Sequence, residues 1–352
     1  MTHGSPHAFR IGERKIGDGF PVYVIAEMSA NHGHDIEVAL KLIDAAKAAG
    51  ADAIKLQTYT PDTLTIDSDK EWFRIKEGLW SGRTLYELYS DAFTPWEWQP
   101  RLQRAARAAG LDFFSTPFDE TAVDFLELLD VPVHKVASFE LVDIPLLEKI
   151  AATGKPVIMS TGMATLEEID EAVRTLRSGG TTDLALLKCT SAYPAPADEA
   201  NLRSIPILAK RFRTVGGLSD HTLGISVPVA AVAVGARIVE KHLTLSRAMG
   251  GPDAEFSLEP AEFRAMVDSV RTAESALGQA EFGPSEKEQQ SRIFRRSLFV
   301  VKDVKAGEPF TRENVRAIRP GYGLHTRHLE EILGRRARRD VERGTPFEWS
   351  FA

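Results

Sequence analysis

The feature of this sequence that most constrains its fold is a regular alternation of two kinds of segment over the first 280 residues. Short runs rich in β-branched and apolar residues end in polar residues, Gly or Pro, and a longer segment with helical period follows. The strand-like runs are 22–27, 53–58, 112–117, 133–138, 156–161, 184–190, 214–221 and 237–244. Several helical segments, such as IEVALKLIDAAKAAG and LEEIDEAVRTLRSGG, close on Gly, the residue expected at a helix C-terminus.

Eight such units favour a (β/α)8 barrel, an α/β fold of the TIM type, over residues 1–280. A doubly wound sheet is the competing architecture, but it usually has fewer strands and a Gly-rich phosphate-binding turn after the first. Neither a GxGxxG motif nor a Walker motif is present in the sequence. We therefore predict the barrel.

The chain changes character after residue 280. Residues 281–296 are polar and charged, and we interpret them as a linker. Residues 297–352 contain short strand-like runs, turn signals such as KAGE and ERGTP, and little helical pattern. A segment of roughly 55 residues is small for an independent core, so we expect it to dock on another surface.

Net charge limits the partners of the chain. The sequence carries 43 Lys and Arg against 50 Asp and Glu, and the resulting −7 argues against nucleic acid as the main partner. From Pro284 to the end there are 15 basic and 10 acidic residues, so this tail is +5 while the rest is −12. A basic tail on an acidic body is either a solvated surface or a lid over an anionic ligand.

Cysteine usage and hydropathy indicate the compartment. The single Cys189 excludes an internal disulfide framework and is consistent with a reducing cytoplasm. No apolar stretch approaches the ~20 residues that a membrane helix needs, and the N-terminal MTHGSPHAFR lacks the apolar core of a signal peptide. We therefore expect a cytoplasmic protein with no membrane partner.

One long insertion interrupts the alternation. Residues 59–93 separate the second strand-like run from its helix, and a βα loop of this length is usually a lid or a binding loop. The insertion is rich in aromatic residues, namely Tyr59, Trp72, Phe73, Trp80, Tyr86, Tyr89 and Phe93. These side chains either pack the loop onto the barrel rim or form a surface on which a sugar stacks.

Polar residues gather where the strands end, which in a barrel is where the active site is built. Lys55 and Lys135, with nearby hydroxyls, predict a cationic bowl that suits phosphate or carboxylate. The hydroxyls belong to Thr116, Ser138, Ser160 and Ser219. Because side chains alternate along a strand, Lys55 and Gln57 share one face, as do Glu240 and His242.

Two histidines and two carboxylates complete the set of candidates. His221 and His242 end the seventh and eighth runs, which are neighbours in a barrel. They predict either a catalytic divalent metal site or hydrogen-bonded rim residues. Glu27 and Glu140 stand at strand ends and are candidates for acid–base chemistry or for contacts to sugar hydroxyls.

The stretch EMSANHGHD, residues 27–35, contains two further histidines that invite a metal interpretation. The pair of histidines on adjoining strand ends is the better metal candidate, so we expect the carboxylate of Glu27 to carry the chemistry here. Asn31 and His32 are expected to shape the βα turn or touch the substrate, and Asp35 suits the first turn of the next helix. His34 is expected at the surface.

Nine strings of this sequence, in order, resemble the sialic acid synthase family, and the resemblance covers nearly the whole chain. The strings are EMSANHGHD, GADAIKLQTY, FFSTPFD, HKVASFEL, PVIMSTGMAT, LLKCTSAYPAP, GLSDHT, VEKHLTL and GPDAEFSL. The tail from RRSLFVV through IRPGYG is similar to the antifreeze-like (SAF) domain at the C-terminus of the family. The resemblance implies an enzyme that condenses phosphoenolpyruvate with an acylated amino sugar and needs a divalent metal such as Mn²⁺, Mg²⁺ or Co²⁺.

The resemblance also implies roles for individual residues. His221 and His242 would be the metal ligands, and Glu27 would act at the reacting carbons, with Lys55 and Lys135 as the other catalytic residues. Phosphoenolpyruvate would be held by Lys55, Thr116, Lys135, Ser138, Ser160, Ser191 and Ser219.

The sugar side of the site follows from the same resemblance. Glu140 and Asp253 would lie near the sugar, with Tyr193 close by. Arg319, in the RPG of the tail, would reach the active site of the partner subunit in a homodimer with swapped C-terminal domains. The basic tail is then better explained as a lid over an anionic site than as a solvated surface.

Within the family the sequence looks most like the pseudaminic acid synthases. N-acetylneuraminate synthases usually carry EAGVNHNG or similar where this chain has EMSANHGHD. The insertion TPDTLTID with LYELYSDAFTPWEW is similar to the pseudaminate branch, whose sugar is 2,4-diacetamido-2,4,6-trideoxy-L-altrose. An aromatic-rich loop suits such a sugar, which is more apolar than N-acetylmannosamine.

Three alternatives stay open at this point. N-acetylneuraminate or legionaminate synthase is the rival within the same chemistry. A metal-dependent aldolase on the same barrel would lack the antifreeze-like tail. A non-catalytic carbohydrate-binding protein would not require Lys, His and Glu at so many strand ends.

Overall fold

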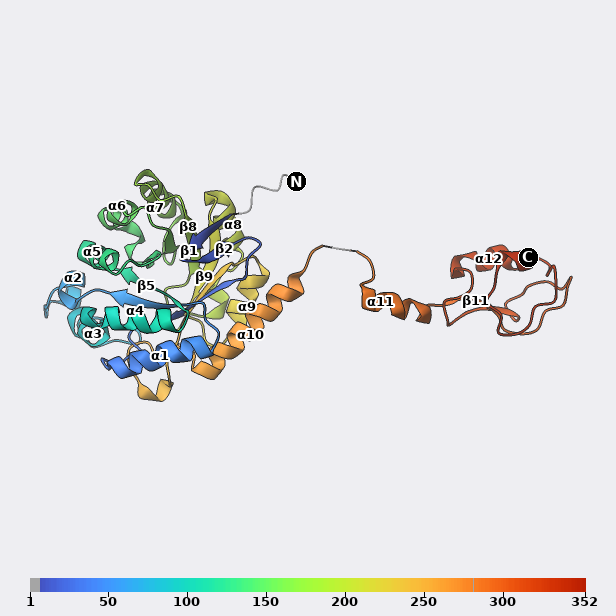
Figure 1. Cartoon of the computed structure of the whole chain (residues 1–352), viewed down its shortest axis with the longest axis horizontal. Helices are drawn as coiled ribbons and strands as arrows, with labels where there is room; N and C mark the ends of the chain where they lie inside the picture. The colour runs from blue at the N-terminus through green and yellow to red at the C-terminus, as the bar shows by residue number, and fades with distance from the viewer. Residues whose placement is uncertain (1–6, 281) are drawn as a thin grey trace. The chain divides into compact units, whose positions relative to one another are not determined.

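The computed structural model describes residues 7–280 and 282–352, which form two compact units (Figure 1). The first unit ends at Gly278 and the second begins at Gln279. Residues 1–6 of the predicted barrel domain and Glu281, the first residue of the predicted linker, lie outside the described residues. The rest of the predicted linker carries the short helix α11 (Glu286–Ser291) and belongs to the second unit.

The first unit is a closed barrel of eight parallel strands in the order β10-β3-β4-β5-β6-β7-β8-β9. The strands are β3 (Tyr23–Glu27), β4 (Ala53–Thr58), β5 (Asp112–Pro117), β6 (His134–Val136), β7 (Val157–Ser160), β8 (Leu184–Cys189), β9 (Val215–Asp220) and β10 (Ile238–His242). Each falls within one of the eight predicted strand-like runs. The predicted (β/α)8 barrel is confirmed.

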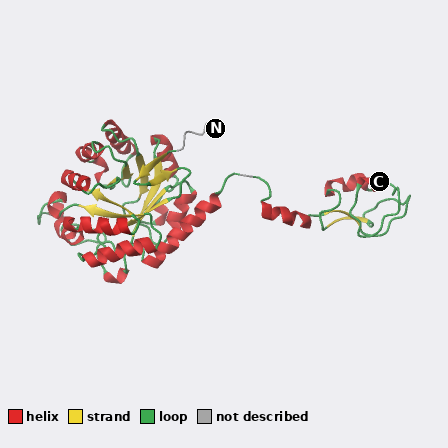
Figure 2. Cartoon of the chain, viewed as in Figure 1, coloured by secondary structure: helices red, strands yellow, loops and turns green. Residues whose placement is uncertain are grey.

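Helices surround the barrel between successive strands (Figure 2). They are α1 (Ile36–Ala48), α4 (Gln99–Ala108), α5 (Glu120–Leu128), α6 (Ile144–Ala151), α7 (Leu166–Ser178), α8 (Ser204–Phe212), α9 (Ser226–Ala233) and α10 (Pro260–Leu277). Side-chain caps set several starts: Asp35 accepts the amide of Glu37, and Thr165 forms a reciprocal capping box with Glu168. Apolar faces of the helices meet the outward faces of the strands in two large buried hydrophobic clusters.

An N-terminal hairpin, β1 (Ala8–Ile11) and β2 (Arg14–Gly17), was not predicted from the sequence. Its apolar side chains join the main core, and Arg14 forms ion pairs with Asp112 (3.1 Å) and Asp52 (3.6 Å), which lie where strands begin. The hairpin therefore covers the N-terminal end of the barrel, and the opposite end carries the strand termini that build the site.

The insertion after β4 is ordered rather than irregular. It contains α2 (Pro61–Leu64), a 3₁₀ turn (Glu71–Phe73) and α3 (Leu85–Ala92), which begins at a Thr84–Glu87 capping box. The indole N–H of Trp80 donates to the carbonyl of Pro252 at 2.9 Å, so the insertion is joined to the loop after β10. This contact and the cavity lining described below place the insertion at the C-terminal end of the barrel.

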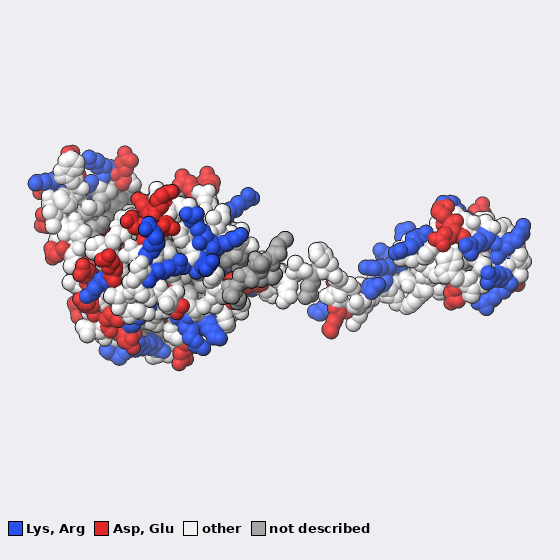
Figure 3. All heavy atoms as spheres, turned by 90° about the horizontal axis from the view of Figure 1, so that it is seen from above, with Lys and Arg blue, Asp and Glu red and all other residues white. Residues whose placement is uncertain are grey.

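The second unit has its own small core. An antiparallel pair, β11 (Ser297–Val300) and β12 (Val315–Ile318), and the helix α12 (Leu329–Ile332) enclose Phe310 and Phe347, whose rings meet edge to face at 4.8 Å. Basic side chains are prominent on this unit (Figure 3). No helix within the described residues is long and apolar enough to cross a membrane.

Candidate active site

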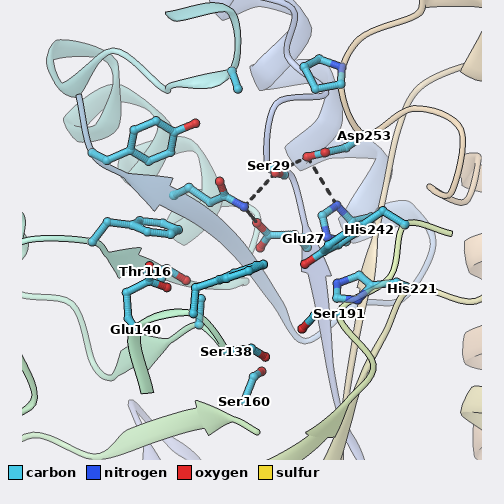
Figure 4. Close-up of a pocket in the computed structure, with 18 of the residues that line it drawn as sticks. Glu27, Ser29, Thr116, Ser138, Glu140, Ser160, Ser191, His221, His242 and Asp253 are labelled. Carbon is cyan, nitrogen blue, oxygen red and sulfur yellow. Dashed lines mark hydrogen bonds and ion pairs between the residues drawn. The ribbon is translucent and has the colours of Figure 1, made fainter. Parts of the chain in front are cut away.

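A cavity of about 540 Å³ opens at the C-terminal end of the barrel strands (Figure 4). It is lined by every predicted site residue of the barrel: Glu27, Lys55, Thr116, Lys135, Ser138, Glu140, Ser160, Ser191, Tyr193, Ser219, His221, His242 and Asp253. Arg319 is the exception, because it is an exposed residue of the second unit, at the end of β12. Fourteen residues from distant parts of the sequence were proposed, and the barrel brings thirteen together.

The cationic bowl is present, and both of its ammonium groups are buried. Lys55 Nζ donates to Thr116 Oγ1 at 3.1 Å, and Lys135 Nζ donates to Ser160 Oγ at 2.7 Å. Burial lowers the pKa of Lys135, whereas the pKa of Lys55 is raised because Glu240 and Glu27 outweigh the effect of its burial. Two lysines and several hydroxyls on one wall are the donors that a phosphate or carboxylate requires.

Gly162 explains how the hydroxyls of Ser138 and Ser191 come close together. Its backbone N–H donates to Ser138 Oγ at 3.0 Å. A Cβ at this position would lie 2.2 Å from Ser191 Oγ and 2.7 Å from Ser138 Oγ. Only glycine therefore leaves room for both hydroxyls, which line the cavity. The STG of PVIMSTGMAT is the sequence signal for this residue, but its reason is visible only in three dimensions.

Glu27 lies on the floor of the cavity with 1% of its surface exposed. Its Oε2 is 2.7 Å from Lys55 Nζ, and its Oε1 accepts from Gln57 Nε2 at 3.2 Å. Burial raises the pKa of Glu27 to about 7, although Lys55 acts in the opposite direction. A carboxyl with this pKa exchanges protons near neutral pH, as a general acid–base group must.

Glu240 is a buried carboxylate that the set of predicted site residues lacks. Its Oε1 accepts from Ser219 Oγ at 3.3 Å and lies 3.7 Å from Lys55 Nζ. Lys135 and Lys55 lower its pKa below the ordinary value in spite of burial. Strand alternation predicted that Glu240 and His242 lie on the same face of β10. Lys241, between Glu240 and His242 on the strand, points the other way and pairs with Asp220 at 2.5 Å.

The two predicted metal-ligand histidines lie side by side, with ring centroids 5.3 Å apart. His221 Nδ1 lies 3.0 Å from the carbonyl oxygen of Thr190, which suits an N–H donor there and leaves Nε2 as an acceptor. His242 Nδ1 is buried without a hydrogen-bond partner among the described residues and lies 3.9 Å from Asp253 Oδ2. Two imidazoles with free nitrogens and a nearby carboxylate fit a divalent cation.

The described residues do not, however, hold a complete metal cage. No group of three or more His, Cys, Asp or Glu side chains in the described part of the chain is arranged to bind a metal ion. A cation here would therefore have open coordination positions, which is the property of a catalytic rather than a structural site.

The outer part of the cavity is mostly apolar and aromatic. Tyr193 packs against His221 at 4.5 Å and Trp80 at 5.5 Å between centroids. The insertion contributes Tyr59, Leu64, Ile75, Glu77, Trp80, Leu85, Leu88, Tyr89 and Ala92 to the wall. Of the seven aromatic residues singled out in the insertion, three reach the cavity; Trp72 is 78% exposed and does not.

Glu140 is the carboxyl on this side of the cavity. Its Oε2 is buried and has no hydrogen-bond partner among the described residues. Burial raises the pKa of Glu140 to about 7. A partnerless carboxyl next to an apolar wall is suited to bind a hydroxyl or an N–H of a ligand.

The stretch 27–35 behaves largely as expected. Asn31 Nδ2 donates to Leu243 O (3.0 Å) and Ser257 Oγ (2.9 Å), and His32 Nε2 contacts Thr94 Oγ1 at 3.0 Å. Both residues shape the turn and neither lines the cavity. His34 is exposed. Ser29 does line the cavity, and it was missed because a serine in a turn carries no distinguishing pattern.

Comparison with known proteins identifies the family. The family model "NeuB family" matches residues 42–282, and the model "SAF domain" matches residues 295–351. The chain belongs to the NeuB family. The predicted resemblance to sialic acid synthases and the predicted antifreeze-like C-terminal domain are thereby confirmed.

Individual relatives span almost the whole chain. A pseudaminic acid synthase of Campylobacter jejuni is 49% identical over 323 residues, which is 92% of this chain and 94% of that protein. An N,N'-diacetyllegionaminic acid synthase of Legionella pneumophila is 36% identical over 343 residues, 96% of each. The crystal structure of an N-acetylneuraminic acid synthetase from Leptospira borgpetersenii superposes with a TM-score of 0.74 at 34% identity, covering 82% of this chain and 96% of that one.

Proposed function

We propose that this protein is a pseudaminic acid synthase, which condenses phosphoenolpyruvate with 2,4-diacetamido-2,4,6-trideoxy-L-altrose to give pseudaminic acid and phosphate. The observation that carries the proposal is a cavity in which buried lysines and hydroxyls surround the buried carboxyl of Glu27, 2.7 Å from Lys55 Nζ. Similarity to a pseudaminic acid synthase over 92% of the chain supports the choice of sugar.

The cationic wall is the site for phosphoenolpyruvate. Lys55 and Lys135 neutralise its anionic groups, and the hydroxyls of Ser138 and Ser191 add directional donors; the backbone N–H of Gly162 holds the Ser138 hydroxyl in place. Both lysines already donate to hydroxyls of the wall, so their positions are set before the substrate arrives. Such preorganisation lowers the cost of binding and of reaching the transition state.

The reaction forms one C–C bond at C3, forms one C–O bond from water to C2, and breaks the C–O bond between C2 and the phosphate oxygen. C3 of the enol attacks the aldehyde carbon of the open-chain sugar, and the carbonyl oxygen takes up a proton. Water then adds to C2 of the resulting cation, and phosphate leaves with the oxygen that bound it to C2. Glu27 stabilises the cation as a carboxylate and accepts the proton of the attacking water.

A divalent metal, Mn²⁺ or alternatively Mg²⁺ or Co²⁺, belongs to this proposal. His221 and His242 would hold it through their free ring nitrogens, with Asp253 beside them. When bound, it would act as a Lewis acid on the sugar carbonyl. The remaining work of binding and proton transfer falls to the side chains of the chain itself.

The sugar would occupy the outer part of the cavity. Glu140, Asp253 and Tyr193 supply its polar contacts and an aromatic face. The insertion adds an apolar wall that includes Leu64, Leu88 and Tyr89, which suits a sugar with a methyl group and two acetamido groups better than a fully hydroxylated one.

We further propose that the protein acts in the cytoplasm as a homodimer with swapped C-terminal domains. In this arrangement Arg319 of one protomer would contact substrate in the partner's cavity. The proposal is supported by the exposure of Arg319 and by the basic character of the SAF domain, which complements an anionic substrate.

The second candidate function is legionaminate or N-acetylneuraminate synthesis, favoured by a 36% identical legionaminic acid synthase and by the structural match to a neuraminic acid synthetase. A carbohydrate-binding protein without activity is the candidate from another class. The buried, mutually paired Lys55, Glu27 and Glu240 speak against it, because burying three charged groups costs stability that a binding surface does not require.

One assay separates these candidates. Phosphate release from phosphoenolpyruvate is measured with each sugar and with metal present or chelated, and the product mass is determined. The proposal predicts release that requires both the trideoxy sugar and the metal, with a nine-carbon acid as product. Absence of sugar-dependent release with every amino sugar would refute synthase activity altogether.

A further inference from the structure

Ser29 occupies an unusual backbone position next to the cavity. Its φ is 45°, in the left-handed region that residues other than glycine rarely adopt. Its side chain is almost fully buried, and the turn around it is held by backbone hydrogen bonds from Asn31 N to Met28 O and from Gly33 N to Ala30 O, both 3.1 Å. A strained residue of this kind persists where its surroundings determine it, and such residues concentrate at functional sites.

The Ser29 hydroxyl connects two side chains that line the cavity. It donates to Asp253 Oδ2 and accepts from Gln57 Nε2 at 2.8 Å (Figure 4 shows Ser29 beside Asp253). The Gln57 NH₂ group can only donate, so the single proton of the serine hydroxyl is left for Asp253.

The same contacts fix the orientation of the Gln57 amide. Its Nε2 donates to Glu27 Oε1 at 3.2 Å as well as to Ser29, so both amide protons are in use. The carbonyl oxygen of Gln57 is then left as an acceptor for a ligand. Without the Ser29 hydroxyl, one amide proton loses its partner and the amide is free to rotate.

Asp253 depends on Ser29 in a similar way. The main chain of Asp253 is anchored, because its carbonyl accepts from Ser257 Oγ at 2.6 Å. Among the described residues, its carboxylate accepts hydrogen bonds from the Ser29 hydroxyl and, at a long 3.5 Å, from the backbone N–H of Ala30, and it lies 3.9 Å from His242 Nδ1. The direction of this carboxylate is therefore set chiefly by one hydroxyl.

We propose that Ser29 is a positioning residue for sugar binding: its hydroxyl fixes the Gln57 carbonyl and the Asp253 carboxylate in the orientations that receive the amino sugar. The inference rests on the proposed synthase function. In Figure 4, Glu27 lies between Ser29 and the serines of the wall, Ser138 and Ser160, and no hydrogen bond in the described residues joins Ser29 to Lys135, Ser138 or Ser160. Its removal should consequently affect the sugar and leave phosphoenolpyruvate almost unaffected.

Two substitutions separate the hydroxyl from the backbone strain. Ser29→Ala removes the hydroxyl but keeps a Cβ at positive φ, whereas Ser29→Gly removes the hydroxyl and relieves the strain. We expect both variants to raise the sugar KM about tenfold, the effect of one lost orienting interaction, with the KM for phosphoenolpyruvate changed less than about twofold. Ser29→Gly should melt at a higher temperature than Ser29→Ala.

Ser115→Ala is the matched control. Ser115 is fully buried and its Oγ is 2.7 Å from Thr58 Oγ1, but it does not line the cavity. Its loss should lower the melting temperature and leave both KM values unchanged, which is the pattern of a merely structural serine.

A double-mutant cycle tests the route of the effect. If Ser29 acts through Gln57, then Ser29→Ala should raise the sugar KM less in a Gln57→Ala background than in the wild type. An unchanged sugar KM in both Ser29 variants, or parallel rises in both KM values, overturns the proposal. Wild-type protein that turns over a different amino sugar contradicts the proposed sugar alone, and the variants are then compared with that sugar.

Discussion

Replacement of Glu140 by glutamine should stabilise the protein at alkaline pH and inactivate it. Burial raises the pKa of Glu140 from an ordinary 4.5 to about 7, and its Oε2 has no partner among the described residues. A glutamine has nearly the same shape but never ionises. The substitution therefore removes the cost of holding a charge in this part of the cavity.

The sign and size of the change in the free energy of unfolding follow from proton linkage. Because the folded-state pKa is raised, the stabilising contribution of the protonated carboxyl is complete below pH 4.5 and is lost as pH rises through about 7. A shift from 4.5 to about 7 corresponds to about 3 kcal/mol at ~1.36 kcal/mol per pKa unit. Glu140→Gln should match the wild type near pH 4.5 and exceed it by about 3 kcal/mol at pH 8.5.

The assay is urea unfolding of wild type and variant, without substrate, at several pH values between 5 and 8.5. Glu148→Gln, at an exposed position of helix α6, is the control and should not change the pH dependence. The same Glu140 variant should lose sugar-dependent turnover, since active-site carboxyls trade stability for function. A Glu140→Gln protein that is no more stable than wild type at pH 8.5 would refute this reasoning.

Three further predictions concern the cationic wall, the proposed metal site and the proposed contact of Arg319 with the partner subunit. Gly162→Ala places a Cβ 2.2 Å from Ser191 Oγ, so the KM for phosphoenolpyruvate in steady-state kinetics should rise by about tenfold or more. An unchanged KM would exclude Ser138 and Ser191 as ligands of phosphoenolpyruvate. Exhaustive chelation should abolish phosphate release, Mn²⁺ should restore it, and His221→Ala or His242→Ala should prevent that restoration; activity that survives chelation would rule out the metal assignment. Arg319→Ala should lower turnover while Arg316→Ala, an exposed neighbour on β12, should not; wild-type kinetics in Arg319→Ala would remove it from the site.

The fold was predictable because the sequence repeats one physical pattern eight times. Each buried strand of a parallel barrel is a short apolar run, and each covering helix has one apolar face. Both patterns can therefore be recognised in the sequence without the structure. The β1–β2 hairpin was missed because its strands, AFRI and RKIG, are four residues long and mostly polar on one side. Its stability comes from tertiary contacts to Asp112 and the core rather than from local pattern.

The site was predictable where residues stand at strand ends and less so elsewhere. Lys55, Lys135 and His242 follow from barrel geometry, since strand C-termini must converge. Ser29 and Gly162 act through a left-handed turn and a close approach, and neither is encoded in local periodicity. Arg319 lies in the second unit, outside the barrel, so barrel geometry does not predict its contacts.

The most direct test of the central claim is a comparison of kcat/KM for a panel of sugars in the phosphate-release assay. The panel contains 2,4-diacetamido-2,4,6-trideoxy-L-altrose, its mannose-type counterpart and N-acetylmannosamine, all with saturating phosphoenolpyruvate and Mn²⁺. We expect the highest kcat/KM for the altrose-configured sugar, by about tenfold or more, because the apolar wall and the paired polar groups discriminate between sugars at the transition state. Faster turnover of N-acetylmannosamine or of the mannose-type sugar would contradict it.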